Sequence, residues 1–327
     1  ELLAYIHLGR KDYAKALEYF GRTQAMLDRG RRQPITPNFH LNYAIATQLA
    51  GETGEAASLL YKAMGVNRAY LDAYVQYVFQ ESGQTNLANS VRVLDKLGEK
   101  SPEDPSLFLY IGLLNSYAKL YPAALAAFEK AEKLAADQEV EEDILTASFY
   151  FWYGAACERS GLFDRAVALF QQAIALEPGA NDPQEFKAYV DSLNYVAYMW
   201  AERGLQLDQA LVYIRKALEA RPESAAYIDT LGWIYFMQLR YDEALREITR
   251  ALDLLPDDPT ITEHMGDVQD KLGRRDEALD WWKKAFVLDP DNAKLASKLT
   301  DRGVDLAPLR EEAQNRRRET KDTEPEA

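Results

Sequence analysis

Cysteine is almost absent from this chain of 327 residues, since Cys157 is the only one, and this excludes an intramolecular disulfide and a cysteine-based metal site. Histidine is scarce as well: His7, His40 and His264 lie far apart, and no spacing between them fits a zinc motif. No run of about 18 apolar residues occurs, so no segment is a candidate for a membrane-spanning helix. We therefore expect no metal, no cofactor and no direct membrane span.

Catalytic motifs are missing too. The sequence has no glycine-rich phosphate loop, no nucleophile elbow and no helix with two metal-binding histidines. Paired carboxylates occur at Asp257 and Asp258 and at Glu311 and Glu312, in an expected turn and in the tail, where solvation explains them most simply. The sequence indicates a protein that is not an enzyme.

Positive charge is in the minority. Lys and Arg number 38 against 52 Asp and Glu, which gives a formal net charge of -14. Nucleic acids and anionic bilayers bind clustered Lys and Arg, so neither is an expected partner. The short basic run from Arg316 to Arg318 is followed by Glu319 and Asp322, and it does not change this expectation.

Glycine and proline are few, at 17 and 13 residues, whereas hydrophobic residues make up 47% of the chain. Together with abundant Ala, Leu, Glu, Lys and Arg, this composition favours helix almost throughout.

The helical pattern repeats with a period of about 34 residues. From Gly232, an alanine follows at Ala244, a second at Ala251 and a proline at Pro256. The same offsets give Gly266, Ala278, Ala285 and Pro290; Gly154, Ala166, Ala173 and Pro178; and Gly112, Ala124 and Ala131 without the proline. A glycine within a helix costs about 1 kcal/mol, which is tolerable where it lets a second helix approach closely.

This pattern resembles the tetratricopeptide repeat over residues 1–292. The sequence of residues 193–292 is similar to that of bacterial members of the family. The resemblance implies an all-α fold, an α-α superhelical solenoid of about eight helix pairs with a C-terminal capping helix. The first pair is expected to be partial and the third degenerate.

About eight extra residues interrupt the period at an acidic insertion, and we divide the array there. The insertion is either a solvated loop or a protrusion that contacts a partner. The expected parts are an N-terminal array over 1–135, the insertion over 136–146, a second array over 147–292, a capping helix over 293–310 and a charged, disordered tail over 311–327.

The resemblance also implies that the first helix of each pair lines a concave groove. Positions one turn from the small mid-helix residue then become candidate contacts for a partner. They are Phe151, Asn194, Tyr198, Asp229, Trp233, Phe236, Glu263 and Asp267. Aromatic anchors beside carboxylates suit a peptide or helix with apolar and basic side chains. An alternative stays open: Tyr198 and Trp233 pack against the next pair instead of facing the groove.

The sequence therefore predicts a non-catalytic scaffold or adaptor that binds other proteins. Two alternatives remain: a structural component of a cell-envelope, secretion or polysaccharide-export assembly that acts through self-association, and the substrate-selecting arm of a larger enzyme. The chain starts inside an expected helix, which suggests that an N-terminal segment is missing. The family resemblance favours a bacterial periplasm or cell envelope over the cytoplasm.

Overall fold

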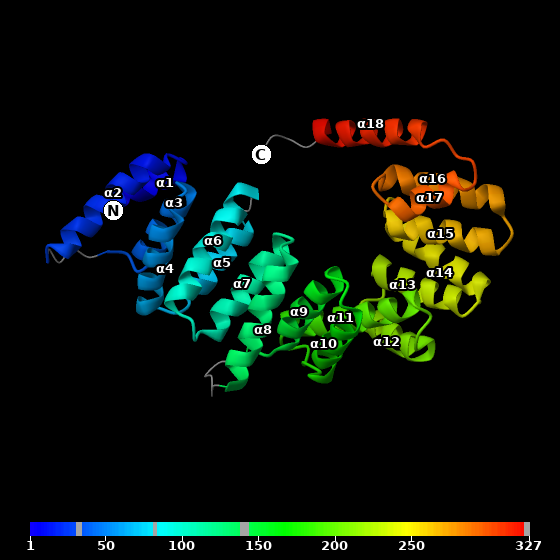
Figure 1. The fold of residues 1–327 in the computed structure, drawn as a ribbon, viewed down its shortest axis with the longest axis horizontal. Helices are drawn as coiled ribbons and strands as arrows, with labels where there is room; N and C mark the ends of the chain where they lie inside the picture. The colour runs from blue at the N-terminus through cyan, green and yellow to red at the C-terminus, as the bar shows by residue number, and fades with distance from the viewer. Residues whose placement is uncertain (31–34, 81–83, 138–143, 324–327) are drawn as a thin grey trace. The chain divides into compact units, whose positions relative to one another are not determined.

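In the computed structural model, residues 1–30, 35–80, 84–137 and 144–323 are described, and within these ranges the chain forms 18 α-helices and no β-strand (Figure 1). The first 16 helices follow one another along the chain as eight pairs. The predicted all-α fold of repeated helix pairs is confirmed. The chain divides into two compact units, Glu1–Leu169 and Phe170–Ala327, and each is described by itself.

The N-terminal unit contains the first four pairs, the helix that follows them and the start of a tenth helix. These helices are α1 (Leu2–Gly9), α2 (Tyr13–Asp28), α3 (Phe39–Leu49), α4 (Thr53–Val66), α5 (Tyr70–Gln80), α6 (Gln84–Lys100), α7 (Pro105–Tyr117), α8 (Tyr121–Asp137), α9 (Ala147–Arg159) and α10 (Phe163–Ala175). The pairs expected to be partial and degenerate, α1 with α2 and α5 with α6, each have both helices.

The C-terminal unit contains three further pairs and two closing helices. These are α11 (Pro183–Glu202), α12 (Leu207–Ala220), α13 (Ala225–Met237), α14 (Tyr241–Leu254), α15 (Pro259–Lys271), α16 (Arg275–Leu288), α17 (Ala293–Thr300) and α18 (Ala307–Thr323). Each first helix packs on its own second helix, and α13 also packs on the first helices before and after it, α11 and α15.

Three of the first helices begin at an Asp-Pro sequence. Asp104, Asp182 and Asp258 are the N-caps of α7, α11 and α15, and each side chain accepts a hydrogen bond from a backbone N–H of the first turn. A proline follows each cap at the first helical position. The backbone N–H at that position would have no acceptor within the helix, so its absence in proline costs nothing. Sequence alone thus sets where these first helices begin.

The predicted close approach at the mid-helix glycines is confirmed at the positions where it can be measured. A Cβ atom added to Gly112 would lie 2.7 Å from the ring of Phe128 on α8, and one added to Gly232 would lie 2.6 Å from Ile248 on α14. Alanine at either position would force the facing side chain, or the helix that carries it, to shift.

The structure differs from the sequence-based division in two places. Its two compact units meet within α10, after Leu169, and not at the insertion over 136–146, of which residues 138–143 lie outside the described residues. The predicted capping helix over 293–310 is two helices, because the chain turns at Gly303 with φ 79°. Residues 311–323 are helical in α18 and not disordered, since Ala, Gln, Glu and Arg there are good helix formers.

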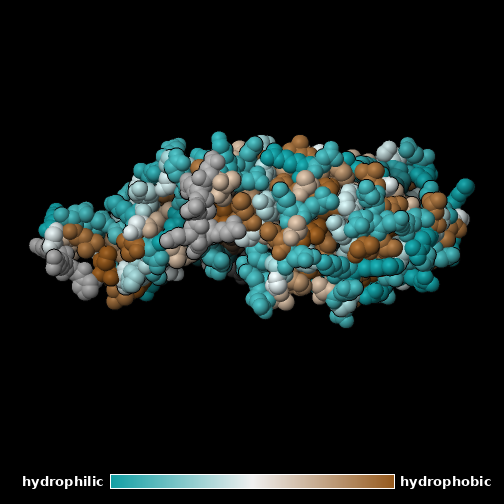
Figure 2. All heavy atoms as spheres, turned by 90° about the horizontal axis from the view of Figure 1, so that it is seen from below, coloured by the Kyte–Doolittle hydropathy of each residue, from teal (hydrophilic) through white to brown (hydrophobic). Residues whose placement is uncertain are grey.

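Large hydrophobic side chains also reach the surface, among them Tyr117 (54% exposed) and Leu239 (72% exposed). The face shown in Figure 2 is mostly hydrophilic, with hydrophobic side chains in separate patches. Scattered exposed apolar residues are normal in a folded protein, so a binding site has to be argued from a more specific arrangement.

Candidate functional site

Seven of the eight predicted contact residues lie on three consecutive first helices of the C-terminal unit. Asn194 and Tyr198 are on α11, Asp229, Trp233 and Phe236 are on α13, and Glu263 and Asp267 are on α15. The eighth, Phe151, lies on α9 in the N-terminal unit, where it is 8% exposed and its ring contacts that of Trp152. The α13 helix packs on both α11 and α15.

At the centre of this face, Asp229 forms a buried ion pair with His264 of α15. Both carboxylate oxygens accept from Nδ1 of His264, at 2.9 and 3.0 Å, and each residue is 5% exposed. Burial alone lowers the pKa of His264, but the charge and hydrogen bond of Asp229 raise it, with smaller contributions from Asp267 and Glu202. The net pKa lies above its ordinary value, so the buried imidazole favours its protonated form.

The ring of Trp233 is packed between a residue of the next pair and a residue of its own helix. Its ring stacks on His264, with ring centroids 4.0 Å apart, and on Phe236, with centroids 4.5 Å apart. Only 8% of Trp233 is exposed, whereas Tyr198 and Phe236 are half-buried.

Two polar atoms on this face have no partner among the described residues. The indole Nε1 of Trp233 and the amide Oδ1 of Asn194 are both buried, and neither makes a hydrogen bond. A buried polar atom without a partner costs about 1–3 kcal/mol, so natural proteins keep few of them. One of these atoms is a donor and the other an acceptor.

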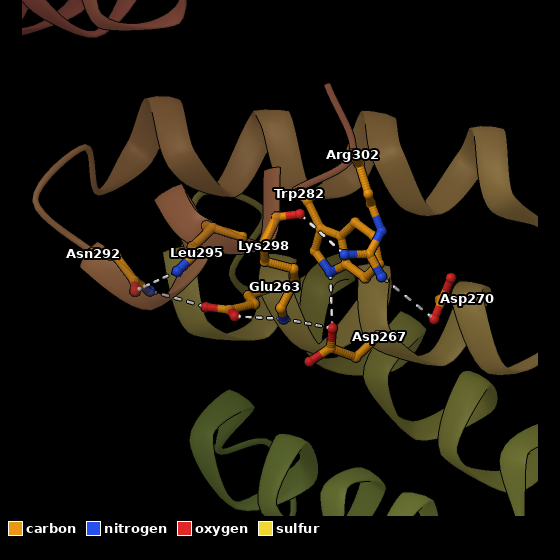
Figure 3. A network of polar contacts seen from close by, with 8 residues as sticks. All are labelled: Glu263, Asp267, Asp270, Trp282, Asn292, Leu295, Lys298 and Arg302. Carbon is orange, nitrogen blue, oxygen red and sulfur yellow. Dashed lines mark hydrogen bonds and ion pairs between the residues drawn. The ribbon is translucent and has the colours of Figure 1, made fainter. Parts of the chain in front are cut away.

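The acidic end of the predicted face is bound by the chain's own closing helix (Figure 3). Nζ of Lys298, on α17, donates to Glu263 at 2.8 Å and to Asp267 at 2.7 Å. Nε1 of Trp282, on α16, donates to the same oxygen of Asp267 at 2.8 Å, and Asn292 donates to the other oxygen of Glu263 at 3.0 Å. Both predicted carboxylates are therefore already paired.

Lys298 sits in a strongly acidic and partly buried position. Burial lowers the pKa of its amine, but Asp267 and then Glu263 raise it by charge and hydrogen bonding, and the net pKa lies above its usual value. The ammonium also lies over the ring of Trp282, with Arg302 on the same ring at 4.4 Å. These contacts fix α17 to the end of the array.

The two ion pairs are the same contact made one repeat apart. Asp229 and His264 are separated by 35 positions, and so are Glu263 and Lys298. A carboxylate of one first helix thus meets a cation of the next first helix. The sequence analysis missed the roles of His264, Lys298 and Trp282. A spacing of 35 positions between an acidic residue and a basic one, which is one repeat plus one residue, could have indicated both ion pairs.

No group of three or more metal-ligating side chains occurs in the part of the chain that the structure describes. Among the same residues, no helix combines the length and apolar character that crossing a bilayer requires.

Tandem helix pairs of this kind define an all-α helical-repeat protein, a class that acts as interaction scaffolds. Sequence models of the tetratricopeptide repeat match residues 121–183 and 225–258. The chain therefore carries tetratricopeptide repeats over these residues. No curated protein matches it.

Several solved structures are similar to the chain. Residues 41 to the end of MamA from Desulfovibrio magneticus RS-1 share 16% identity, covering 58% of this chain and 97% of that one, with a TM-score of 0.45. YrrB, described as a TPR protein with an unusual peptide-binding site, shares 20% identity over 64% of this chain and 99% of its own, with a TM-score of 0.44. The C-terminal part of a TPR protein from Cytophaga hutchinsonii shares 17% identity over 68% and 81%, with a TM-score of 0.47. At TM-scores below 0.5, these likenesses carry no argument about binding.

Proposed function

We propose that this chain is a non-catalytic scaffold that binds a peptide or helix of a partner protein on the first helices of its C-terminal unit. The contact residues are Asn194 and Tyr198 of α11 and Trp233 and Phe236 of α13. Phe151 belongs to the other unit and is left out. Glu263 and Asp267 are left out because Lys298 pairs with both.

The observation that carries the proposal is the pair of polar atoms without partners. Nε1 of Trp233 needs an acceptor, and Oδ1 of Asn194 needs a donor. A peptide main chain offers one carbonyl and one N–H per residue, and pairing both would remove two unfavourable burials. Both atoms are covered, so binding requires rotation of half-buried neighbours such as Phe236, which stacks on Trp233.

The chemistry of the partner follows from the half-buried rings and the exposed carboxylate on this face. Tyr198 and Phe236 offer half-buried rings to apolar side chains. Glu202, at the end of α11, is exposed, forms no ion pair with another described residue, and lies near enough to His264 to raise its pKa. It is the carboxylate available for a basic side chain. The partner segment is therefore apolar and basic.

The test is cross-linked co-purification from the native cells, comparing the wild-type chain with Trp233→Phe. This change removes Nε1, which bonds nothing in the free protein, and keeps an aromatic ring. The matched control is Trp281→Phe on the second helix α16 of the same unit, where the half-buried ring lies under Lys284.

Partner proteins recovered with the wild type and with Trp281→Phe, but depleted with Trp233→Phe, support the proposal. Equal recovery by all three chains contradicts it. If this chain is recovered with no other protein, the result favours self-association over partner binding.

A further inference from the structure

The N-terminal unit has a cavity that none of the predicted site residues lines. Its volume is about 260 Å³, and Leu8, Ile45 and Tyr77 bring side chains to it from α1, α3 and α5. These are the first helices of three successive pairs. The cavity is smaller than the roughly 300–1,000 Å³ pockets that hold drug-sized ligands, and its size suits one large side chain.

The lining combines aliphatic side chains with the polar groups of Lys11, Tyr13, Asn42 and Tyr77, and the cavity is partly open. Leu49 adds to Leu8 and Ile45, and at the rim Gly9 faces open space, since a Cβ atom added there would have no neighbour within 4 Å. An apolar side chain inserted here would leave water and contact three aliphatic residues. The helices that form the cavity are the ones that line the binding face in a helical-repeat scaffold.

Among the residues that the structure describes, Lys11 is the one charged residue that lines the cavity. It is exposed, and it forms no ion pair with any described residue, whereas the neighbouring Asp12 pairs with His7 and Lys15. Residues 1–36 hold 7 Lys and Arg against 4 Asp and Glu, a balance of +3 in a chain whose net charge is -14. The charge at this cavity therefore favours an anion.

We propose that the cavity binds a partner segment that inserts one apolar side chain between α1 and α3 and places a neighbouring carboxylate at the amine of Lys11. We call it the N-terminal pocket. This inference does not rest on the proposed function, because it concerns the other unit and a partner segment of opposite charge.

Two substitutions test the pocket without disturbing the fold. Lys11 occupies a left-handed turn position with φ 60°, and the same turn position holds glycine at Gly51 and Gly161, so Lys11→Gly removes the charge and fits the backbone. The matched control is Lys119→Gly, the same change at the turn between α7 and α8, also at φ 60°.

The second substitution fills the pocket. Gly9→Leu adds a side chain where a Cβ meets nothing, at the last residue of α1. Its control is Gly65→Leu on α4, where a Cβ also meets nothing within 4 Å.

The experiment is methyl NMR of the full chain, with labelled Leu and Ile, titrated with three capped tetrapeptides. They have the sequences Gly-Phe-Asp-Gly, Gly-Phe-Lys-Gly and Gly-Ala-Asp-Gly. We expect the Phe-Asp peptide to shift the methyl signals of Leu8, Ile45 and Leu49 and to bind about threefold to tenfold more tightly than either of the others.

Lys11→Gly should bring the Phe-Asp affinity down to that of the Phe-Lys peptide, and Gly9→Leu should abolish the shifts. Both controls should bind like the wild type. Three results overturn the pocket: no shift at the three methyl groups, shifts confined to the C-terminal unit, or equal affinity for the Phe-Asp and Phe-Lys peptides.

Discussion

The two units differ in the kind of polar side chain that they bury beside their first helices. In the N-terminal unit, the buried polar side chains are neutral: Gln48 donates to Ser90 at 2.8 Å and accepts from Tyr74. In the C-terminal unit, the first-helix face holds buried charge in the pair Asp229–His264. The first face keeps an open pocket, whereas on the second face ion pairs and stacked rings cover the polar atoms that a partner would have to reach.

This difference shows that the repeat pattern does not by itself set the chemical character of the first-helix face. The same repeat pattern places a small residue in the middle of a first helix in both units, at Gly112 in one and Gly232 in the other. Whether the face beside it is open depends on the next first helix, which supplies a cation in the C-terminal unit. The following predictions test this contrast.

The largest effect is expected from breaking the buried ion pair with Asp229→Ala. The change removes the counter-charge of a buried pair, so His264 must stay charged without it or release its proton, at a cost of up to about 3–5 kcal/mol. Because long repeat arrays unfold in parts, the measurement is hydrogen exchange of the α13 and α15 amides.

Two further variants set the scale for that result. Asp229→Asn keeps a hydrogen-bond acceptor for His264 and should cost less. Tyr74→Phe removes a neutral hydrogen bond to Gln48 in the N-terminal unit and should cost about 1–2 kcal/mol. An Asp229→Ala loss no larger than that of Tyr74→Phe would contradict the contrast between charged and neutral interiors.

The second prediction compares one substitution at two tryptophans of the C-terminal unit. Trp282→Phe removes a hydrogen bond to the carboxylate of Asp267 and should cost about 1.5–3 kcal/mol. Trp233→Phe removes an N–H that bonds nothing and should change stability by less than about 1 kcal/mol. Urea denaturation of both variants measures the difference; equal losses would mean that the Trp233 donor has a partner in solution.

These tryptophans also show how far the sequence could predict the site. The repeat register placed Trp233 and Asp267 on first helices, because periodicity and the Gly-Ala spacing are local signals. It could not show that His264 covers Trp233, or that Lys298 binds Asp267, because those contacts join different repeats. The pocket at Lys11 was missed as well, since a cavity depends on how three helices pack and leaves no motif.

The third prediction is a pH dependence of opposite sign in the two units. The pKa of His264 is raised above its unfolded value. Its contribution to the stability of the C-terminal unit is therefore complete below about pH 6.5 and is lost as the pH rises through the folded pKa. Burial and then the charge of Lys62 lower the pKa of His40 on α3, so acidification below about pH 6.5 destabilises the N-terminal unit there.

Hydrogen exchange at pH 8 and pH 6, corrected for the intrinsic rate, measures both effects. Protection of α15 should increase on acidification while that of α3 decreases. His264→Gln should remove the first effect and His40→Gln the second. A change of the same sign in both units would contradict the assignment of these two histidines.

The smallest effect concerns a feature that the two units share, the turn between the helices of a pair. Leu239 occupies the left-handed position of this turn with φ 64° and is 72% exposed, whereas Gly204 and Gly273 hold the equivalent positions in the neighbouring pairs. A left-handed conformation costs a non-glycine residue about 1–2 kcal/mol, and glycine loses about 0.5–1 kcal/mol through the entropy of the unfolded chain. Leu239→Gly should therefore stabilise the C-terminal unit by about 0.5–1 kcal/mol in thermal denaturation, and Leu239→Ala, which keeps the Cβ atom, should not. Lys119→Gly should give the same small gain in the N-terminal unit, because the turn is common to both units and only their first-helix faces differ.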